Sequence, residues 1–309
     1  MPDRLLRLGT RGSALAVAQS GQVAATVIAE LSRHVEMVTV QTQGDVAPGS
    51  ISQLGSVGVF VSALRDALLA DEVDFAVHSY KDLPTAAADG IVVAAVPVRQ
   101  DARDALVARD GLTLGELPAG ARIGTGSPRR TAQLLGLGLG LEVVPIRGNV
   151  DTRLRKVAEG EVDGVILARA GLARLERLDE ITEVIDPLQM LPAPAQGALA
   201  IECRADDDEV VELLRALDHP DSRAAVDAER ALLAALEAGC TAPVGAMAEV
   251  AEGDDGSELF LRGLVAAADG TDMVRLSATG PTSDAVGVGR RLAAELLDLG
   301  AADLMGVTR

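Results

Sequence analysis

Three short patterns occur twice in this chain of 309 residues, in the same order both times. Ordered recurrence of this kind indicates two halves built on one plan of strand, turn and helix. It constrains the fold more strongly than the composition does. The paired stretches are LGTRGSALAVAQ from Leu8 and IGTGSPRRTAQ from Ile123, VQTQGDV ending at Val46 and VPIRGNV ending at Val150, and EVDFAVHS from Glu72 and EVDGVILA from Glu161.

The two halves are expected to alternate strands and helices. Continuous apolar runs such as DFAVHS and DGVILA favour buried parallel strands. The predicted fold class is α/β, with two periplasmic-binding-protein-like doubly wound domains joined by a hinge with a cleft, plus a small α+β C-terminal domain. Strands are predicted at 5–10, 36–42, 74–79, 91–97, 121–125, 141–147 and 163–168, and helices at 13–32, 58–70, 128–136 and 150–159.

Two segments are predicted to cross between the halves. The first is 97–104, and the second is the proline-containing stretch MLPAPAQ, after which GALAIECR forms a strand that rejoins the first half. Two crossings make a hinge. The predicted domains are 1–98 plus 198–219, 99–197, and 220–309. The third is expected to hold a helix at 221–237, strands near 246–251, 258–266 and 272–279, and a helix near 284–299.

Composition limits the kind of core that the chain can form and its cellular location. Apolar residues make up 48% and only four residues are aromatic, so the cores must consist of Leu, Val, Ala and Ile. No apolar run approaches the roughly 20 residues of a membrane span, and the N-terminus shows no signal-peptide h-region. The chain is expected in the cytoplasm, away from membranes. We expect a monomer, because nothing resembles an exposed apolar seam.

Charge is distributed unevenly along the chain. The net charge of −18 argues against nucleic acid as a partner. The segment 121–156 nevertheless carries seven basic and two acidic residues. Arg129 and Arg130 begin a predicted helix capped by Ser127, where each cation opposes the helix dipole at a cost of about 0.3–1 kcal/mol. Placing two there suggests that an anion compensates them.

Further arginines occupy the same topological position after other strands. Arg147 ends a predicted strand, Arg153 begins the helix that follows, and Arg174 follows VILARAGLARL. An arginine-lined cleft in an acidic protein implies a ligand with several carboxylates or phosphates. A phosphate ligand would usually come with a glycine-rich P-loop, and the sequence has none. Carboxylates fit better, although any single arginine could be a surface charge.

The stretch FAVHSYKDLPT places a carboxylate just beyond a buried strand. Asp82 follows Lys81 in a bend closed by Pro84, where it could serve acid–base chemistry, stabilise a cation, or form an Asx-type turn. His78 lies within the apolar strand and is expected to be a core residue. The Gly-, Ser- and Pro-rich segment 43–58 has two interpretations, a mobile flap or an insertion without a role.

The two cysteines raise a separate question. Cys240 sits in the bend LEAGCTAPVG after a predicted helix, where a thiol could be a packed small hydrophobe, a metal ligand, half of a disulfide, a nucleophile or an attachment point. Two cysteines make no disulfide framework, and the three histidines show no metal-ligand spacing. No metal site is predicted. Cys203, in the apolar run ALAIECR, is expected to be packed and inert.

Five motifs together carry a family resemblance. HSYKDLP, GTGSPRR, RGNVDTRL, LPAPAQGALAIECR and LEAGCTAPVG, in this order and spacing, resemble porphobilinogen deaminase, also called hydroxymethylbilane synthase. The resemblance covers essentially the whole chain. It implies a transferase of haem and tetrapyrrole biosynthesis that adds four porphobilinogen molecules to a dipyrromethane cofactor, releases ammonia and frees hydroxymethylbilane.

The resemblance also assigns residues. It implies that Cys240 holds the dipyrromethane through a thioether and that Asp82 is the catalytic aspartate, which stabilises the cationic azafulvenium left when ammonia departs. Phe60 matches an aromatic position facing the site. The residues implied to bind cofactor and substrate side chains are Arg11, Ser13, Lys81, Thr125, Ser127, Arg129, Arg130, Arg147, Arg153, Arg174 and Gln196.

The chain departs from the family pattern at a few positions. Gly126 replaces a serine and removes one hydroxyl contact, Ala238 replaces a frequent glycine, and Gln53 and Val57 stand where many members carry lysines. The alternative function is a non-enzymatic, two-lobed binding protein for a polycarboxylate, which would explain neither a third domain nor a cysteine in its bend. A metal-dependent lyase lacks ligands.

Overall fold

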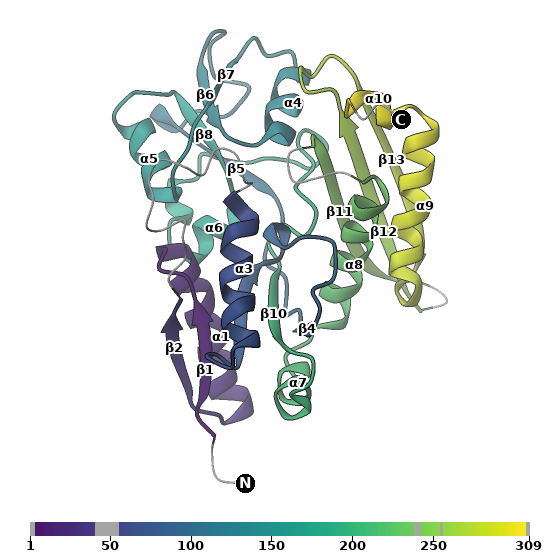
Figure 1. The fold of residues 1–309 in the computed structure, drawn as a ribbon. Coiled ribbons are helices and arrows are strands. Elements are labelled where there is room, and N and C mark those ends of the chain that lie inside the picture. The colour runs from purple at the N-terminus through teal and green to yellow at the C-terminus, as the bar shows by residue number, and fades with distance from the viewer. Residues whose placement is uncertain (1–3, 41–55, 238–241, 254–255, 307–309) are drawn as a thin grey trace. The chain divides into compact units, whose positions relative to one another are not determined.

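A computed structural model describes residues 4–40, 56–237, 242–253 and 256–306; for residues 56–60 it describes the backbone alone. The chain forms two compact units (Figure 1). The first consists of 1–99 and 198–223, and the second of 100–197 and 224–309. Each unit is considered by itself below. The division into three domains stays a prediction.

The first unit contains a five-stranded sheet of order β2-β1-β3-β10-β4. Strand β1 pairs in parallel with β2 and β3, while β10 runs antiparallel to both β3 and β4. The predicted return of the chain to the first sheet is therefore observed in β10. The strands are β1 (Leu6–Thr10), β2 (Val35–Thr39), β3 (Phe75–Ser79), β4 (Ile91–Ala95) and β10 (Leu199–Arg204); the helices are α1 (Ala14–Leu31), α3 (Ser56–Leu69) and α7 (Asp208–Arg215), and Tyr80–Asp82 form the 3₁₀ turn η1.

The second unit contains a sheet with the corresponding order β7-β6-β8-β5-β9. Strand β6 pairs in parallel with β7 and β8, and β5 runs antiparallel to β8 and β9. The strands are β5 (Asp104–Ala108), β6 (Arg122–Thr125), β7 (Glu142–Pro145), β8 (Gly164–Ala168) and β9 (Glu183–Val184); the helices are α4 (Pro128–Gly136), α5 (Val150–Ala158) and α6 (Arg169–Arg174), with 3₁₀ turns η2 (Arg109–Gly111) and η3 (Leu178–Glu180).

The two sheets match strand for strand, which confirms the repeat read from the sequence. Strand β1 leads to α1 through the N-cap Ser13, and β6 leads to α4 through the N-cap Ser127. In each sheet the antiparallel strand, β10 or β5, comes just after the chain has crossed from the other half. The sheets are thus mixed, whereas the apolar runs of β3 and β8 had favoured parallel neighbours. Strand β5 was not predicted, because 97–104 was assigned to the crossing.

Helix α1 is long and apolar enough, by length and composition, to cross a membrane. In the structure its polar residues are used inside the first unit. The buried Gln19 donates to Ser79 Oγ at 2.8 Å, and the buried Ser20 donates to Thr10 Oγ1 at 2.8 Å. Val23 and Val27 join the core of the first sheet. These contacts are those of a helix that packs on a sheet of its own protein.

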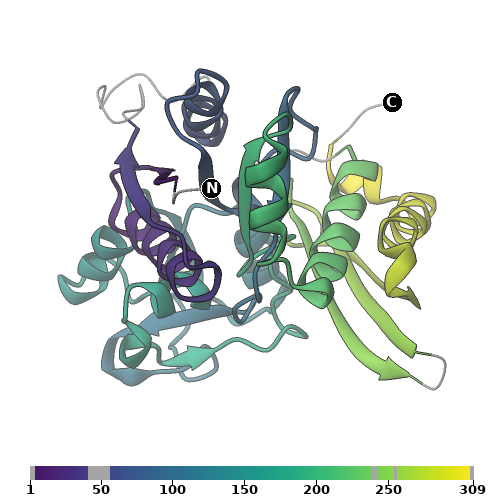
Figure 2. The same ribbon diagram turned by 90° about the horizontal axis from the view of Figure 1, so that it is seen from below.

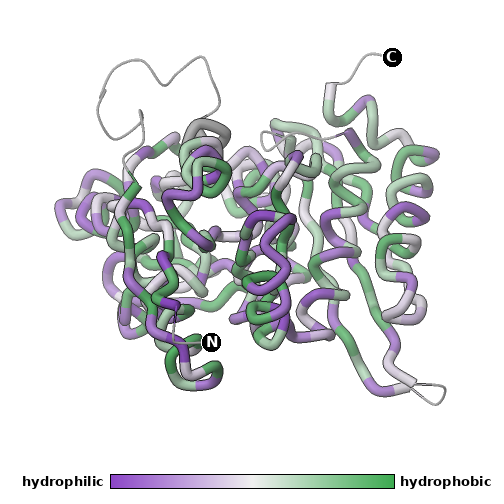
Figure 3. Tube along the Cα trace, turned by 60° about the horizontal axis from the view of Figure 1, so that its bottom comes forward, coloured by the Kyte–Doolittle hydropathy of each residue, from purple (hydrophilic) through white to green (hydrophobic). Residues whose placement is uncertain are grey.

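The C-terminal part of the second unit is an antiparallel sheet of order β11-β12-β13 with helices α8 and α9 on one face (Figures 1 and 2). The buried residues of α9 recur at the three- and four-residue spacing of an amphipathic helix, and its trace carries both hydrophobic and hydrophilic residues (Figure 3). At Gly289 of α9 a Cβ would lie 2.2 Å from Ala228 O, so the two helices pack backbone against backbone. The elements are α8 (Pro220–Ala235), β11 (Val244–Gly253), β12 (Gly256–Ala266), β13 (Met273–Pro281), η4 (Thr282–Asp284), α9 (Ala285–Asp298) and α10 (Ala301–Leu304).

Within the second unit, this small sheet packs directly on helix α4. Ala132 and Leu191 form an apolar cluster with Leu264 and Ala266 of β12. A Cβ at Gly270, where φ is +72°, would lie 2.5 Å from Ala132 O. Only glycine accommodates both the left-handed backbone and this approach.

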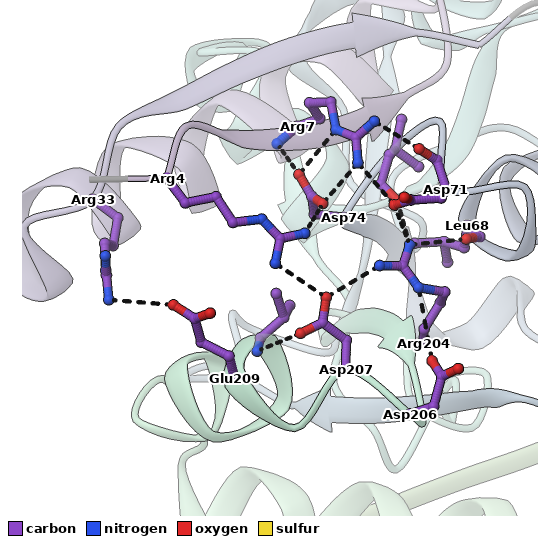
Figure 4. A network of polar contacts seen from close by, with 12 residues as sticks. Arg4, Arg7, Arg33, Leu68, Asp71, Asp74, Arg204, Asp206, Asp207 and Glu209 are labelled. Atoms are coloured by element: carbon purple, nitrogen blue, oxygen red, sulfur yellow. Dashed lines mark hydrogen bonds and ion pairs between the residues drawn. The ribbon is translucent and has the colours of Figure 1, made fainter. Parts of the chain in front are cut away.

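A network of ion pairs closes the first unit at the amino end of its sheet (Figure 4). Asp74, which begins the approach to β3, accepts from Arg7 Nη2 at 2.9 Å and from Arg4 Nη2 at 2.6 Å. Arg204, at the end of β10, pairs with Asp207 at 3.1 Å and with Asp71 at 2.9 Å. The network therefore ties β1, β3, β10 and the start of α7 together.

Candidate functional site

In the first unit, the sequence-predicted site residues gather at one edge of the sheet. Arg11 and Ser13 follow β1, and Lys81 and Asp82 lie in η1 directly after β3. Because β1 and β3 are neighbouring parallel strands, their carboxyl ends share this edge. Ser13 Oγ also accepts from Ala16 N at 3.3 Å, so it caps α1 as well.

The turn that carries Asp82 is held from both sides. Tyr80 and Leu83 are buried, and Tyr80 N donates to Ala198 O at 3.0 Å. Asp82 itself is half-buried. In the described part of the chain, no side chain makes a hydrogen bond or an ion pair with its carboxylate. The backbone of the turn is thus fixed, and it presents a carboxylate that is unpaired among the described residues.

Beneath this turn lies a buried polar triad. Glu202 of β10 accepts from Arg65 at 2.6 and 3.1 Å, and its Oε2 lies 3.2 Å from His78 Nε2. Burial opposes the ionisation of Glu202, but the bonds from His78 and Arg65 outweigh it and lower its pKa to about 2. His78 is thus a core residue with a partner, as the sequence indicated. Sequence reasoning missed Arg65 and Glu202.

In the second unit, the predicted residues gather at the carboxyl end of β6. Thr125 is buried and its Oγ1 accepts from Ser127 N at 3.2 Å. Ser127 in turn caps α4 by accepting from Arg130 N at 3.5 Å, and Pro128 opens the helix. Gly126 lies so close to the next strand that a Cβ would stand 2.8 Å from Ile146 O. The departure from serine at this position therefore fits the local packing.

Arg129 and Arg130 point into the protein and share one carboxylate. Their exposed fractions are 4% and 6%, and Asp104 at the start of β5 is fully buried. Asp104 lies 2.8 Å from Arg129 Nη1 and accepts from Arg130 Nη2 at 2.7 Å. Burial opposes the ionisation of Asp104, but the two guanidinium groups outweigh it and hold its pKa well below the usual range. The compensating anion expected from the sequence is thus present within the chain, as a single charge against two.

Gln196 joins the same cluster. Its Nε2 donates to Asp104 Oδ1 and to Ala102 O, both at 2.8 Å. The next residue, Gly197, has φ +88°, and a Cβ there would lie 2.4 Å from Gln100 O. Glycine is therefore required where the chain passes this close to another backbone segment.

Arg153 and Arg174 are half-buried cations that pair with no carboxylate among the described residues. Arg153 Nε donates to Gly148 O at 2.9 Å, and Arg174 Nη2 donates to Gly197 O at 2.7 Å. Burial, and then the charge of Arg130, lower the pKa of Arg153. Burial lowers the pKa of Arg174 to about 10. Neutral carbonyl oxygens do not balance these charges.

The second-unit edge therefore carries more cationic than anionic charge. Among the described residues, Arg129 and Arg130 share the single carboxylate of Asp104, and Arg153 and Arg174 bond only to backbone carbonyl oxygens. The Nε atoms of Arg129 and Arg174 are buried without a hydrogen-bond partner there. Arg147 follows β7 and is exposed, outside this buried group. Such a surplus is suited to an anionic ligand.

Several predicted residues lie beyond what the structure describes. Cys240 and Ala238 belong to 238–241, and most of the 43–58 segment, including Gln53, belongs to 41–55. Phe60 lies in α3, where the backbone alone is described. Cys203 is fully buried, and burial raises its thiol pKa to about 12, so it is unreactive.

Among the described residues, no three His, Cys, Asp or Glu side chains are arranged to hold a metal ion. Sequence reasoning missed two buried carboxylates, Asp104 and Glu229, that organise the second unit. The available signal for Asp104 was an acidic residue at the start of the apolar run DALVA. The sequence gives no sign that Glu229 is buried, because its polar neighbours in the helix are typical of a solvent-exposed face.

Two family models match the chain. The model described as porphobilinogen deaminase, dipyrromethane cofactor-binding domain, matches residues 6–212. The model of the C-terminal domain of porphobilinogen deaminase matches residues 224–298. Among solved structures, a periplasmic substrate-binding protein of an ABC transporter from Coxiella burnetii is 14% identical, with a TM-score of 0.44, covering 71% of this chain and 94% of that one.

Curated relatives match over nearly the whole chain, and each of the three below is named porphobilinogen deaminase. The protein of Mycobacteroides abscessus is 58% identical, over 98% of this chain and 100% of the relative. That of Nocardia farcinica is 59% identical, over 97% and 88%. That of Mycobacterium tuberculosis is 59% identical, over 97% and 98%. By its two matching domains and these relatives, the chain belongs to the porphobilinogen deaminase family.

Proposed function

We propose that this chain is a transferase that joins four porphobilinogen molecules onto a dipyrromethane primer, releases ammonia and yields hydroxymethylbilane. The family match supports the reaction class. In this chain itself, the main support for the proposal is the surplus of guanidinium charge at the carboxyl end of the second-unit sheet. Each pyrrole ring of the substrate and the primer bears an acetate and a propionate, so the growing chain is a polyacid.

The residues present fit a dipyrromethane. Arg174 offers a buried Nε without a partner among the described residues, and Arg153 lacks a carboxylate there. Both are therefore suited to the carboxylates of the cofactor. By resemblance to the family, Arg129 and Arg130 are proposed to bind them too. When bound, the dipyrromethane supplies the primer to which substrate rings are added. By resemblance to the family, the attachment point is Cys240.

Asp82 is proposed to act on the substrate. Asp82 lies in η1, is half-buried, and its carboxylate is unpaired among the described residues. Such a group accepts hydrogen bonds from pyrrole N–H groups and stabilises the positive charge that develops on the porphobilinogen ring as ammonia departs. Lys81, the preceding residue, lies at the same sheet edge and is proposed, by resemblance to the family, to bind a substrate carboxylate. Arg11 and Ser13 complete the proposed first-unit set.

The direct test is to incubate the purified protein with porphobilinogen and measure ammonia and linear tetrapyrrole together. We expect one ammonia released for each porphobilinogen consumed. A non-enzymatic polycarboxylate-binding protein would bind porphobilinogen without releasing ammonia, and that result would refute the proposal.

We also propose that the protein is a cytoplasmic monomer. The support for a location away from membranes is that the polar residues of α1 are used within the first unit. Light scattering coupled to gel filtration should give a mass near 31.7 kDa. A mass of twice that value would exclude a monomer.

A further inference from the structure

The segment Leu191–Gly197, termed here the strap, is held by site arginines at both ends. Leu191 O accepts from Arg129 Nη1 at 2.6 Å, and Gln133 exchanges two further hydrogen bonds with the Leu191 backbone. At the other end, Gly197 O accepts from Arg174 Nη2 at 2.7 Å. Gln196 within the strap reaches Asp104. The position of the strap is thus linked to the cationic cluster.

The middle of the strap is held by a carboxylate from another part of the second unit. Glu229 of α8 is fully buried. Its Oε2 accepts from Ala195 N at 2.5 Å, and its Oε1 accepts from Ala248 N of β11 at 2.6 Å. One side chain therefore connects the strap, helix α8 and strand β11.

Ala195 shows why the strap needs such a contact. Its φ is +61°, in the left-handed region that residues with a Cβ rarely adopt. The hydrogen bond from Ala195 N to Glu229 favours this conformation, which in turn directs Gln196 toward Asp104. A second backbone bond, from Ala246 N to Pro192 O at 2.9 Å, holds β11 against the strap.

The connected elements flank the predicted attachment point in sequence. Helix α8 ends at Ala235 and strand β11 begins at Val244, on either side of Cys240. Through its two bonds, Glu229 sets both flanks relative to Gln196, Arg129 and Arg174.

We propose that Glu229 is a positioning residue for the transfer reaction, which fixes the flanks of Cys240 against the strap that carries Gln196. The proposal rests on the proposed function, because it assumes that Cys240 carries the primer. Glu229 acts through the strap and through β11, and it does not touch the reacting atoms. It couples the covalent anchor to the residues that bind the polyacid.

The test uses the full-length, cofactor-loaded protein and Glu229→Gln. A glutamine has one acceptor oxygen, so it can serve only one of the two backbone N–H groups. We expect kcat for porphobilinogen to fall at least tenfold with KM within threefold, and amide exchange at Ala195 or Ala248 to accelerate at least tenfold. Glu295→Gln, the same change on the exposed face of α9, is the control and should leave kcat, KM and amide exchange unchanged.

A second variant separates positioning from general stability. Adding Ala195→Gly to Glu229→Gln supplies a residue that adopts the left-handed conformation without help. We expect kcat of the double variant to be at least threefold higher than that of Glu229→Gln alone. A kcat of Glu229→Gln within twofold of the unmodified protein, or no recovery in the double variant, would overturn the proposal.

A variant that fails to fold also decides the question. If Glu229→Gln does not fold, kcat, KM and amide exchange are measured on Glu229→Asp, whose shorter side chain cannot reach both donors. If neither variant folds, Glu229 is a stability residue and the proposal is wrong. The outcome is separable from the proposed function. An unmodified protein that releases no ammonia from porphobilinogen refutes that function, while amide exchange at Ala195 and Ala248 still reports on the hydrogen bonds to Glu229.

Discussion

The molecule contains two groups of arginines that differ in how their charge is balanced. In the first-unit network, Arg4, Arg7 and Arg204 alternate with the carboxylates of Asp71, Asp74 and Asp207 (Figure 4). At the second-unit edge, Arg129 and Arg130 share Asp104, whereas Arg153 and Arg174 donate to backbone carbonyl oxygens and pair with no carboxylate among the described residues. The first group is complete in itself, whereas the second carries surplus charge.

The pKa shifts follow this difference. Hydrogen bonds to Asp74 raise the pKa of Arg7. Burial lowers the pKa of Arg174 to about 10, and no carboxylate among the described residues offsets it. A charge taken out of water without a counter-ion is unfavourable to the protein alone. The comparison therefore separates arginines that are paired with carboxylates from arginines that we propose bind an anionic ligand.

The largest expected effect compares the central carboxylates of the two groups. Asp104→Asn leaves the buried Arg129 and Arg130 without a charge partner and should lower the free energy of unfolding by about 3–5 kcal/mol. Asp74→Asn should cost less, about 1–3 kcal/mol, because Arg4 and Arg7 are partly exposed and keep Asp207 and Asp71 as partners. Only Asp104→Asn should also reduce turnover per folded molecule, because Asp104 orients Arg129, Arg130 and Gln196. Denaturant melts and steady-state rates measure both. Equal losses of turnover in the two variants would break the distinction.

The next effect concerns Asp82, an unpaired carboxylate in the described part of the chain. Asp82→Asn should fold and keep the cofactor while turnover falls about 10²–10³-fold, the usual loss when one electrostatic contact to a transition state is removed. Asp206→Asn, an exposed member of the network in Figure 4, is the control and should keep normal turnover. Near-normal rates in Asp82→Asn would remove this residue from catalysis.

Acid stability gives a third test. Glu202 ionises with a pKa lowered from 4.5 to about 2. The ionised carboxylate contributes about 3 kcal/mol to the free energy of unfolding above pH 4.5, and this contribution is lost as the pH falls from there toward 2. Glu202→Gln should therefore be less stable at pH 7 and show a shallower loss of stability between pH 4.5 and 2. An acid profile as steep as that of the unmodified protein would contradict this assignment.

The smallest effect compares one arginine from each group. Arg174→Gln removes a buried charge that lacks a counter-ion, so the unfolding free energy should change by less than about 1 kcal/mol while turnover falls about tenfold. Arg7→Gln should lose about 1–3 kcal/mol of stability and keep turnover. The reverse pattern would show that the surplus charge serves the fold.

Much of the fold could be predicted from local signals. Helix α4 matches its predicted bounds because Ser127 and Pro128 mark its start, and the return of β10 to the first sheet followed from the prolines before it. Strand β5 was missed because its short apolar run follows a highly charged segment. Its antiparallel direction depends on the crossing, which no local pattern records.

The sequence predicted which residue types form the candidate site and at which edge of each sheet they lie, because the carboxyl ends of neighbouring parallel strands lie at the same edge. Which arginines are balanced was not predictable. Asp104 lies 25 residues before Arg129 in the sequence, and Glu229 acts on Ala195 and Ala248 through the folded backbone. These are long-range contacts of buried polar groups. The assignment of Cys240 remains a prediction from the family resemblance.

The central claim is that the surplus guanidinium charge serves a polycarboxylate held covalently by the chain. The intact mass of the purified, active protein tests this most directly. The account predicts a mass above that of the sequence by one dipyrromethane, and its loss in Cys240→Ser. An active protein whose mass equals that of its sequence would contradict the account.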